Sequence, residues 1–226
     1  MKEYLAPVIL LLLLIPAVTA ATVAISPTKV DPGDAVSVSL KDLSDGVKFS
    51  FGISAEFDVT PDERFTFTAR DLFLPFSLDS GEVGAYTKGT SQTGLSAKKG
   101  ETTIRLGDSA DEQGEYRITQ PSSISSGTYD FLTLSGRASS TAKSIITELT
   151  MTGTKKGPDD GTISFALEGI ESGTTTIAVY IDGSEVHSQR ITIGLDPEPE
   201  ETDTPFPGPD TPSPGPDTPH SPGGPG

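Results

Sequence analysis

The chain has 226 residues, of which 32 are acidic and 16 are basic, so its formal net charge is −16. It contains no cysteine, no tryptophan and no asparagine. The missing cysteine excludes disulfides, a thiolate nucleophile and cysteine-ligated zinc or iron–sulfur centres. The missing asparagine excludes N-glycosylation sequons. The only histidines are His187 and His220, so a site with two imidazoles in the folded part is excluded as well.

The first twenty residues have the composition of a targeting segment. Lys2 is followed by an apolar stretch from Leu5 to Val18, and Ala20 completes a cleavage motif of small residues. We therefore predict that 1–20 is a helical signal peptide cleaved after Ala20. A helix of fourteen residues spans about 21 Å against about 30 Å of hydrocarbon, so its length disfavours an uncleaved membrane anchor, which is the first alternative. A buried core helix is the second alternative and the less favoured of the two. We expect a secreted or cell-surface protein with no membrane insertion after signal removal.

The last thirty-one residues, 196–226, contain eleven prolines, seven acidic residues and no basic one. Proline lacks the backbone N–H and the acidic groups repel one another, so this composition predicts a disordered, extended tail. Pro-Gly-Pro-Asp-Thr-Pro occurs at 207–212 and again at 214–219, as in spacers that hold a domain away from a surface.

Residues 21–195 retain 15 basic and 24 acidic side chains, a net charge of −9. The folded part is therefore acidic in its own right. An acidic surface without a basic patch argues against nucleic-acid binding and against docking on anionic membranes. It is typical of a soluble exported protein.

The middle of the chain shows apolar residues with a period of two, which indicates half-buried strands. Asp182-Gly183 separates two such runs and predicts a two-residue hairpin turn. Thr141 to Met151 could form a helical face, but its threonines favour a strand. We predict one all-β domain at 21–195, an antiparallel β-sandwich of the Ig-like or jelly-roll-like kind. The alternating runs lie at 36–40, 49–53, 65–67, 163–167, 177–181 and 191–193.

Two local patterns refine this prediction. Seven phenylalanines fall between Phe49 and Phe76, and we expect them to form the main core layer rather than an exposed platform for sugars. The motif Ile-x-Ser-Gly-Thr occurs at 124–128 and again at 170–174. It indicates related strand-turn-strand units in one sandwich, two small domains divided near 108–114, or a shared turn chemistry without duplication.

No catalytic, cofactor-binding or metal-binding residue is assigned, and we expect neither a cofactor nor enzymatic activity. His187 lies in a predicted hairpin strand without a nucleophile elbow, so a solvent-facing histidine is favoured over a catalytic one. A pair of carboxylates for glycoside hydrolysis has no supporting aromatic cleft. Acidic loops could bind calcium, and Asp108 to Glu112 is the best candidate, but none has the alternating spacing of a calcium loop.

Val30-Asp31-Pro32-Gly33-Asp34 opens the domain after Ile25-Ser26-Pro27, and the acidic Thr/Pro stalk closes the chain. This layout resembles secreted surface proteins of archaea, particularly methanogens, and the opening resembles the first strand of cohesin-type and other Ig-like modules. The archaeal likeness implies a β-sandwich ectodomain held off the cell by its stalk. In that group a hydrophobic sorting segment often follows the stalk, whereas this sequence stops at Gly226 and leaves a C-terminal anchor unsupported.

From these features we expect a non-catalytic exported protein with a structural or adhesive role at the cell envelope. Its expected partners are envelope components or other surface proteins. A glycan- or calcium-binding sandwich is the alternative, and a secreted hydrolase is the least favoured one.

Overall fold

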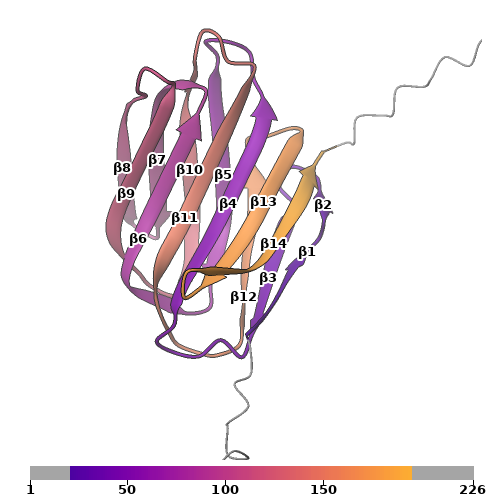
Figure 1. Ribbon diagram of the computed structural model, residues 1–226, viewed down its shortest axis with the longest axis vertical. Helices are drawn as coiled ribbons and strands as arrows, with labels where there is room; N and C mark the ends of the chain where they lie inside the picture. Colours follow the sequence, from indigo (N-terminus) through magenta and orange to yellow (C-terminus); the bar gives the residue numbers. More distant parts are fainter. Residues whose placement is uncertain (1–20, 195–226) are drawn as a thin grey trace, which may run out of the picture. The chain divides into compact units, whose positions relative to one another are not determined.

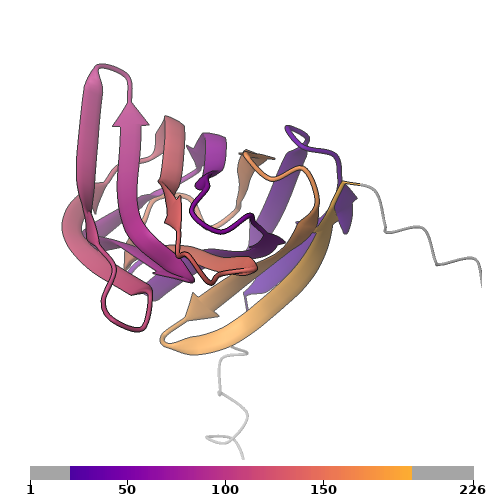
Figure 2. The same ribbon diagram turned by 90° about the horizontal axis from the view of Figure 1, so that it is seen from above.

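The computed structural model describes residues 21–194. This part of the chain contains β-strands and no helix (Figure 1). Two seven-stranded sheets lie face to face as the layers of a sandwich (Figure 2). This confirms the predicted all-β, sandwich-like class. The predicted signal helix at 1–20 and the tail at 196–226 lie outside the described residues.

Sheet A contains, in spatial order, β1 (Thr22–Ser26), β3 (Ala35–Lys41), β12 (Gly161–Glu168), β5 (Arg64–Leu74), β10 (Gly127–Ala138), β7 (Thr90–Lys99) and β8 (Thr102–Ser109). Sheet B contains β2 (Lys29–Val30), β14 (Ser184–Ile193), β13 (Gly173–Ile181), β4 (Lys48–Asp58), β11 (Ser144–Lys156), β6 (Ser77–Lys88) and β9 (Glu115–Ile124). All neighbouring strands are antiparallel except β2 and β14, which are parallel. Both sheets draw strands from before and after residues 108–114.

The core lies between the sheets and is built from the alternating residues. Six of the seven phenylalanines between 49 and 76 are buried, as predicted for a core layer. Phe73 differs, because 40% of it is exposed. Asp71 has a positive φ of 51° and bulges out of β5, so Ala69 and Leu72 both face the interior and Phe73 is turned outward.

Turn chemistry connects these strands as the sequence indicates. Asp182 and Gly183 have φ values of 50° and 82° and join Ile181 to its partner Ser184, which is the two-residue hairpin that the sequence predicts. The Thr141–Met151 segment enters strand β11, so its helical alternative is wrong. Every second residue of β11 is buried, including Ile145, Leu149 and Met151, and this period of two decides the outcome.

The two copies of the Ile-x-Ser-Gly-Thr motif occupy equivalent places. Each carries the chain from one sheet to the other, between β9 and β10 at the first copy and between β12 and β13 at the second. Ile124 and Ile170 are both buried at the start of the crossing, and Gly127 and Gly173 both have positive φ at its end. The shared sequence therefore serves a shared crossing from sheet to sheet.

Candidate functional site

Strands β8 and β9 form one open side of the sandwich, because each is the last strand of its sheet. The chain joins them directly through a turn in which Gly114 N donates to Asp111 O at 3.0 Å and Asp111 N donates to Glu115 O at 2.8 Å. Strands inside a sandwich bury every second residue. In β8 no residue is buried, so its inward face is left uncovered.

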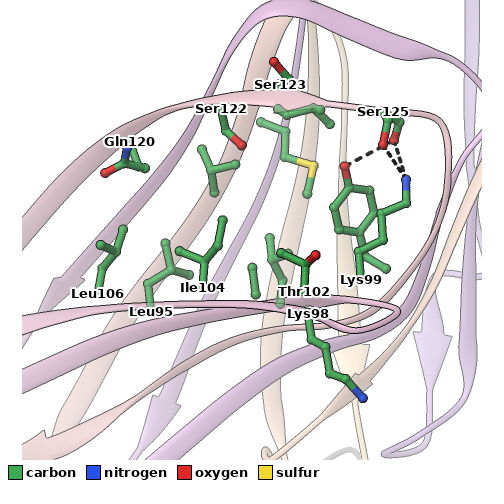
Figure 3. A pocket seen from close by; sticks show the side chains of 16 residues that line it. Leu95, Lys98, Lys99, Thr102, Ile104, Leu106, Gln120, Ser122, Ser123 and Ser125 are labelled. Carbon is green, nitrogen blue, oxygen red and sulfur yellow. Dashed lines mark hydrogen bonds between the residues drawn. The ribbon is translucent and has the colours of Figure 1, made fainter.

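A groove of about 260 Å³ lies between these two edges. Ile104 and Leu106 face into it from β8, and Gln120 and Ser122 face into it from β9 (Figure 3). Ile104 is 43% exposed, one of the three large apolar side chains left exposed in the described part of the chain. The bottom of the groove is made of apolar residues from four further strands: Val83, Leu95, Ala97, Leu132 and Met151.

One end of the groove is polar and carries a lysine. The Lys99 ammonium donates to Ser125 O at 2.9 Å, to Ser125 Oγ at 2.7 Å and to Ser126 O at 2.6 Å. It also lies 4.4 Å from the centre of the Tyr129 ring, and the Tyr129 hydroxyl donates to the same Ser125 carbonyl (Figure 3). These contacts fix the end of β7 to the crossing between β9 and β10.

Lys99 and Tyr129 at this end are both half-buried. Burial lowers the pKa of Lys99 and raises the pKa of Tyr129, because both charged forms lose water. Within residues 21–194 no carboxylate forms an ion pair with Lys99, whereas the preceding Lys98 points away from the groove and lies 3.6 Å from Asp130 (Figure 3). All the ammonium protons of Lys99 go to neutral oxygens, so its positive charge is not neutralised by an acidic neighbour.

The catalytic and calcium-binding candidates considered from the sequence, His187 and Asp108 to Glu112, do not line the groove. His187 is half-buried on β14 opposite Val179, far along the sheet order from the groove. Of the acidic candidates, Asp111 uses one carboxylate oxygen to accept from the N–H groups of Gln113 and Glu115, at 3.0 and 2.8 Å, which is the geometry of a turn. In the described part of the chain no three acidic or histidine side chains are close enough together to hold a metal ion.

Sequence reasoning missed the groove. The segments 102–109 and 115–124 contain few apolar residues, so they do not stand out as strands. The sequence does contain a weak strand pattern there. Ile104 and Leu106, the large apolar residues of β8, alternate with the polar Thr103 and Arg105.

The fold and the site define an all-β sandwich with an apolar groove between the edge strands of its two sheets. No protein-family model matches the chain, and no curated protein matches it. Among solved structures, the chain is similar to the sporulation control protein Spo0M of Bacillus subtilis, with 9% identity and a TM-score of 0.17. The match covers 78% of this chain, and the chain spans about half (49%) of the Spo0M structure. Among the described residues there is no helix of the length and hydropathy needed to cross a membrane.

Proposed function

We propose that this protein is a non-catalytic component of the cell envelope or extracellular space, exported by the signal segment at 1–20, with a structural or adhesive role. The observation that supports a binding role is the groove between β8 and β9, where Ile104 is 43% exposed beside a bottom of buried apolar residues. Exposed apolar surface that is grouped in a hollow is typical of a contact site rather than of an inert surface. The partners in this proposal are envelope components or other surface proteins.

We propose further that the sandwich is of the Ig-like or jelly-roll-like kind and that the acidic Pro-rich segment at 196–226 serves as a disordered spacer. The support is compositional: eleven prolines and seven like charges cannot supply a core. It is this layout that resembles archaeal surface proteins.

Retention of the purified protein on envelope preparations tests the proposal. Ile104→Asp places a charge in the groove, and we expect it to abolish retention. Val186→Asp is the matched control, because Val186 is also 43% exposed but lies on β14, outside the groove. Equal retention of the wild type and Ile104→Asp, or no retention of the wild type, would contradict the proposed function.

A glycan-binding role is the second candidate, and it depends on the outer face of sheet A. A shallow hollow there combines the Phe131 ring with Arg70, Arg105 and Glu168. Aromatic rings beside charged hydrogen-bonding groups suit a sugar. A glycan array decides this candidate: binding that Phe131→Ala removes supports it, and an array without any bound glycan excludes it.

A further inference from the structure

The size and composition of the groove limit what can fill it. An engineered protein cavity of about 150 Å³ lined by Leu, Ile and Phe binds benzene, which has six carbon atoms. In proportion, the 260 Å³ groove holds an apolar chain of about ten carbon atoms. The residues along its length, Leu95, Ile104, Leu106 and Met151, carry no charge and suit such a chain.

The polar end of the groove favours a ligand with a negative charge. Lys99 lines the groove, and its ammonium is fixed by Ser125 and Ser126 without an acidic partner among the described residues. Because its protons are already donated, it offers a ligand its charge rather than a new hydrogen bond. The Thr102 hydroxyl, opposite Lys99 on β8, also lines the groove and can donate a hydrogen bond. A positive charge held beside an apolar surface attracts an anion whose remainder is apolar.

We infer that the groove binds the single chain of an anionic amphiphile, such as a fatty acid. The chain lies between β8 and β9, and the anionic head lies at the Lys99 end. An extended peptide added to an edge strand is less favoured, because β9 carries Pro121, which has no N–H to donate, and the groove is lined by side chains. This inference rests on the proposed function, since it names the occupant of the same groove.

Calorimetric titration of the full protein with three ten-carbon probes tests the inference. Decanoate, decanol and decyltrimethylammonium share the chain and differ in the charge of the head. We expect decanoate to bind about fivefold more tightly than decanol, in line with one partly exposed ion pair, and the cationic probe to bind most weakly. Equal affinity for the three probes, or no binding of decanoate, would overturn the inference.

Two lysine variants isolate the charge. Lys99→Gln should reduce the affinity for decanoate about fivefold and leave the affinity for decanol unchanged. Lys98→Gln removes the same charge one residue away on a side chain that points out of the groove, and it should change neither affinity (Figure 3). Lys99→Arg keeps the charge and should bind decanoate as the wild type does, which separates the charge from the packing of the crossing. A loss of affinity shared equally by Lys98→Gln and Lys99→Gln would contradict the assignment of the head to Lys99.

The envelope experiment and the titrations test the two proposals separately. If Ile104→Asp abolishes envelope retention while decanoate does not bind the wild type, the proposed function stands and the amphiphile is wrong. If decanoate binds and Ile104→Asp abolishes that binding while the wild type is not retained on envelopes, the amphiphile site stands and the envelope role is wrong. Binding of an extended apolar peptide in place of decanoate would assign the groove to a protein partner and overturn the inference.

Discussion

The ammonium of Lys155 lies 3.0 Å from Oδ1 of Asp45, a residue 110 positions away in the sequence. The lysine side chain is fully buried at the end of β11, whereas 59% of the Asp45 side chain is exposed. Asp159 lies 3.2 Å from the same nitrogen, and the Gly157 carbonyl accepts from it at 2.8 Å. Two exposed carboxylates from two surface loops, Asp45 and Asp159, therefore neutralise one buried ammonium group.

Lys155→Met is expected to lower the free energy of unfolding by about 2 kcal/mol. The substitution removes three hydrogen bonds from a charged donor, and the two exposed carboxylates regain only part of this loss from water. Lys156→Met is the control, because Lys156 is 72% exposed and lies 3.6 Å from Asp79, so its removal should cost less than about 0.5 kcal/mol. Urea unfolding of the three proteins measures both effects. Similar losses for the two variants would contradict the role of burial.

The same contact predicts an acid-sensitive part of the stability. The hydrogen bond from Lys155, and then that from the Gly157 N–H, lower the pKa of Asp45 below its ordinary 3.8. A carboxyl group with a lowered pKa in the folded state stabilises the fold above pH 3.8, and this stabilisation is lost as the pH falls through the lowered value. In Asp45→Asn this part of the pH dependence should vanish. Unfolding curves from neutral to strongly acidic pH test this, and an unchanged acid slope in the variant would refute it.

The strands and the hairpin turn could be predicted from the sequence, whereas the groove and the buried Lys155 could not. Alternation in β4 and β13 predicts strands because each buries one face, and Asp182-Gly183 predicts its turn because few other pairs adopt positive φ twice. The groove depends on which strands end each sheet, and that pairing is set by contacts between distant segments. The burial of Lys155 has the same cause, since its partner Asp45 comes from a distant loop.

Two buried threonines should respond in opposite ways to the same substitution. Thr175 Oγ1 is buried and has no hydrogen-bond partner in the described part of the chain. Thr175→Val replaces this hydroxyl with a methyl group of similar size, so we expect about 1 kcal/mol of added stability.

Thr87 is the matched comparison. Its hydroxyl is buried and bonded to those of Thr90 and Thr93, at 3.0 and 2.8 Å. Thr87→Val removes both bonds, so we expect a loss of about 1 kcal/mol. Thermal unfolding of the two variants shows whether each substitution raises or lowers the stability. A loss of stability in Thr175→Val would mean that the Thr175 hydroxyl has a hydrogen-bond partner in solution.

The backbone around Gly136 on β10 leaves no room for a side chain. A Cβ at Gly136 would overlap the carbonyl oxygen of Gln92 and would lie 2.9 Å from the Phe65 ring. Gly136 lies on β10 just before the register shift against β7, so the two backbones approach each other where a side chain would stand. Gly136→Ala must push β7 and β10 apart, and we expect a loss of about 3 kcal/mol or more.

Gly52→Ala should behave differently, although Gly52 is also in the middle of a strand. A Cβ there would lie 3.7 Å from the Thr150 methyl group, which is an ordinary contact. The alanine reduces the freedom of the unfolded chain, so we expect a gain of up to about 1 kcal/mol. Urea unfolding of both variants compares the same chemical change at two positions. Neither glycine has a positive φ, so backbone strain does not distinguish them. A similar loss at Gly52 would therefore contradict lack of space as the reason for glycine at Gly136.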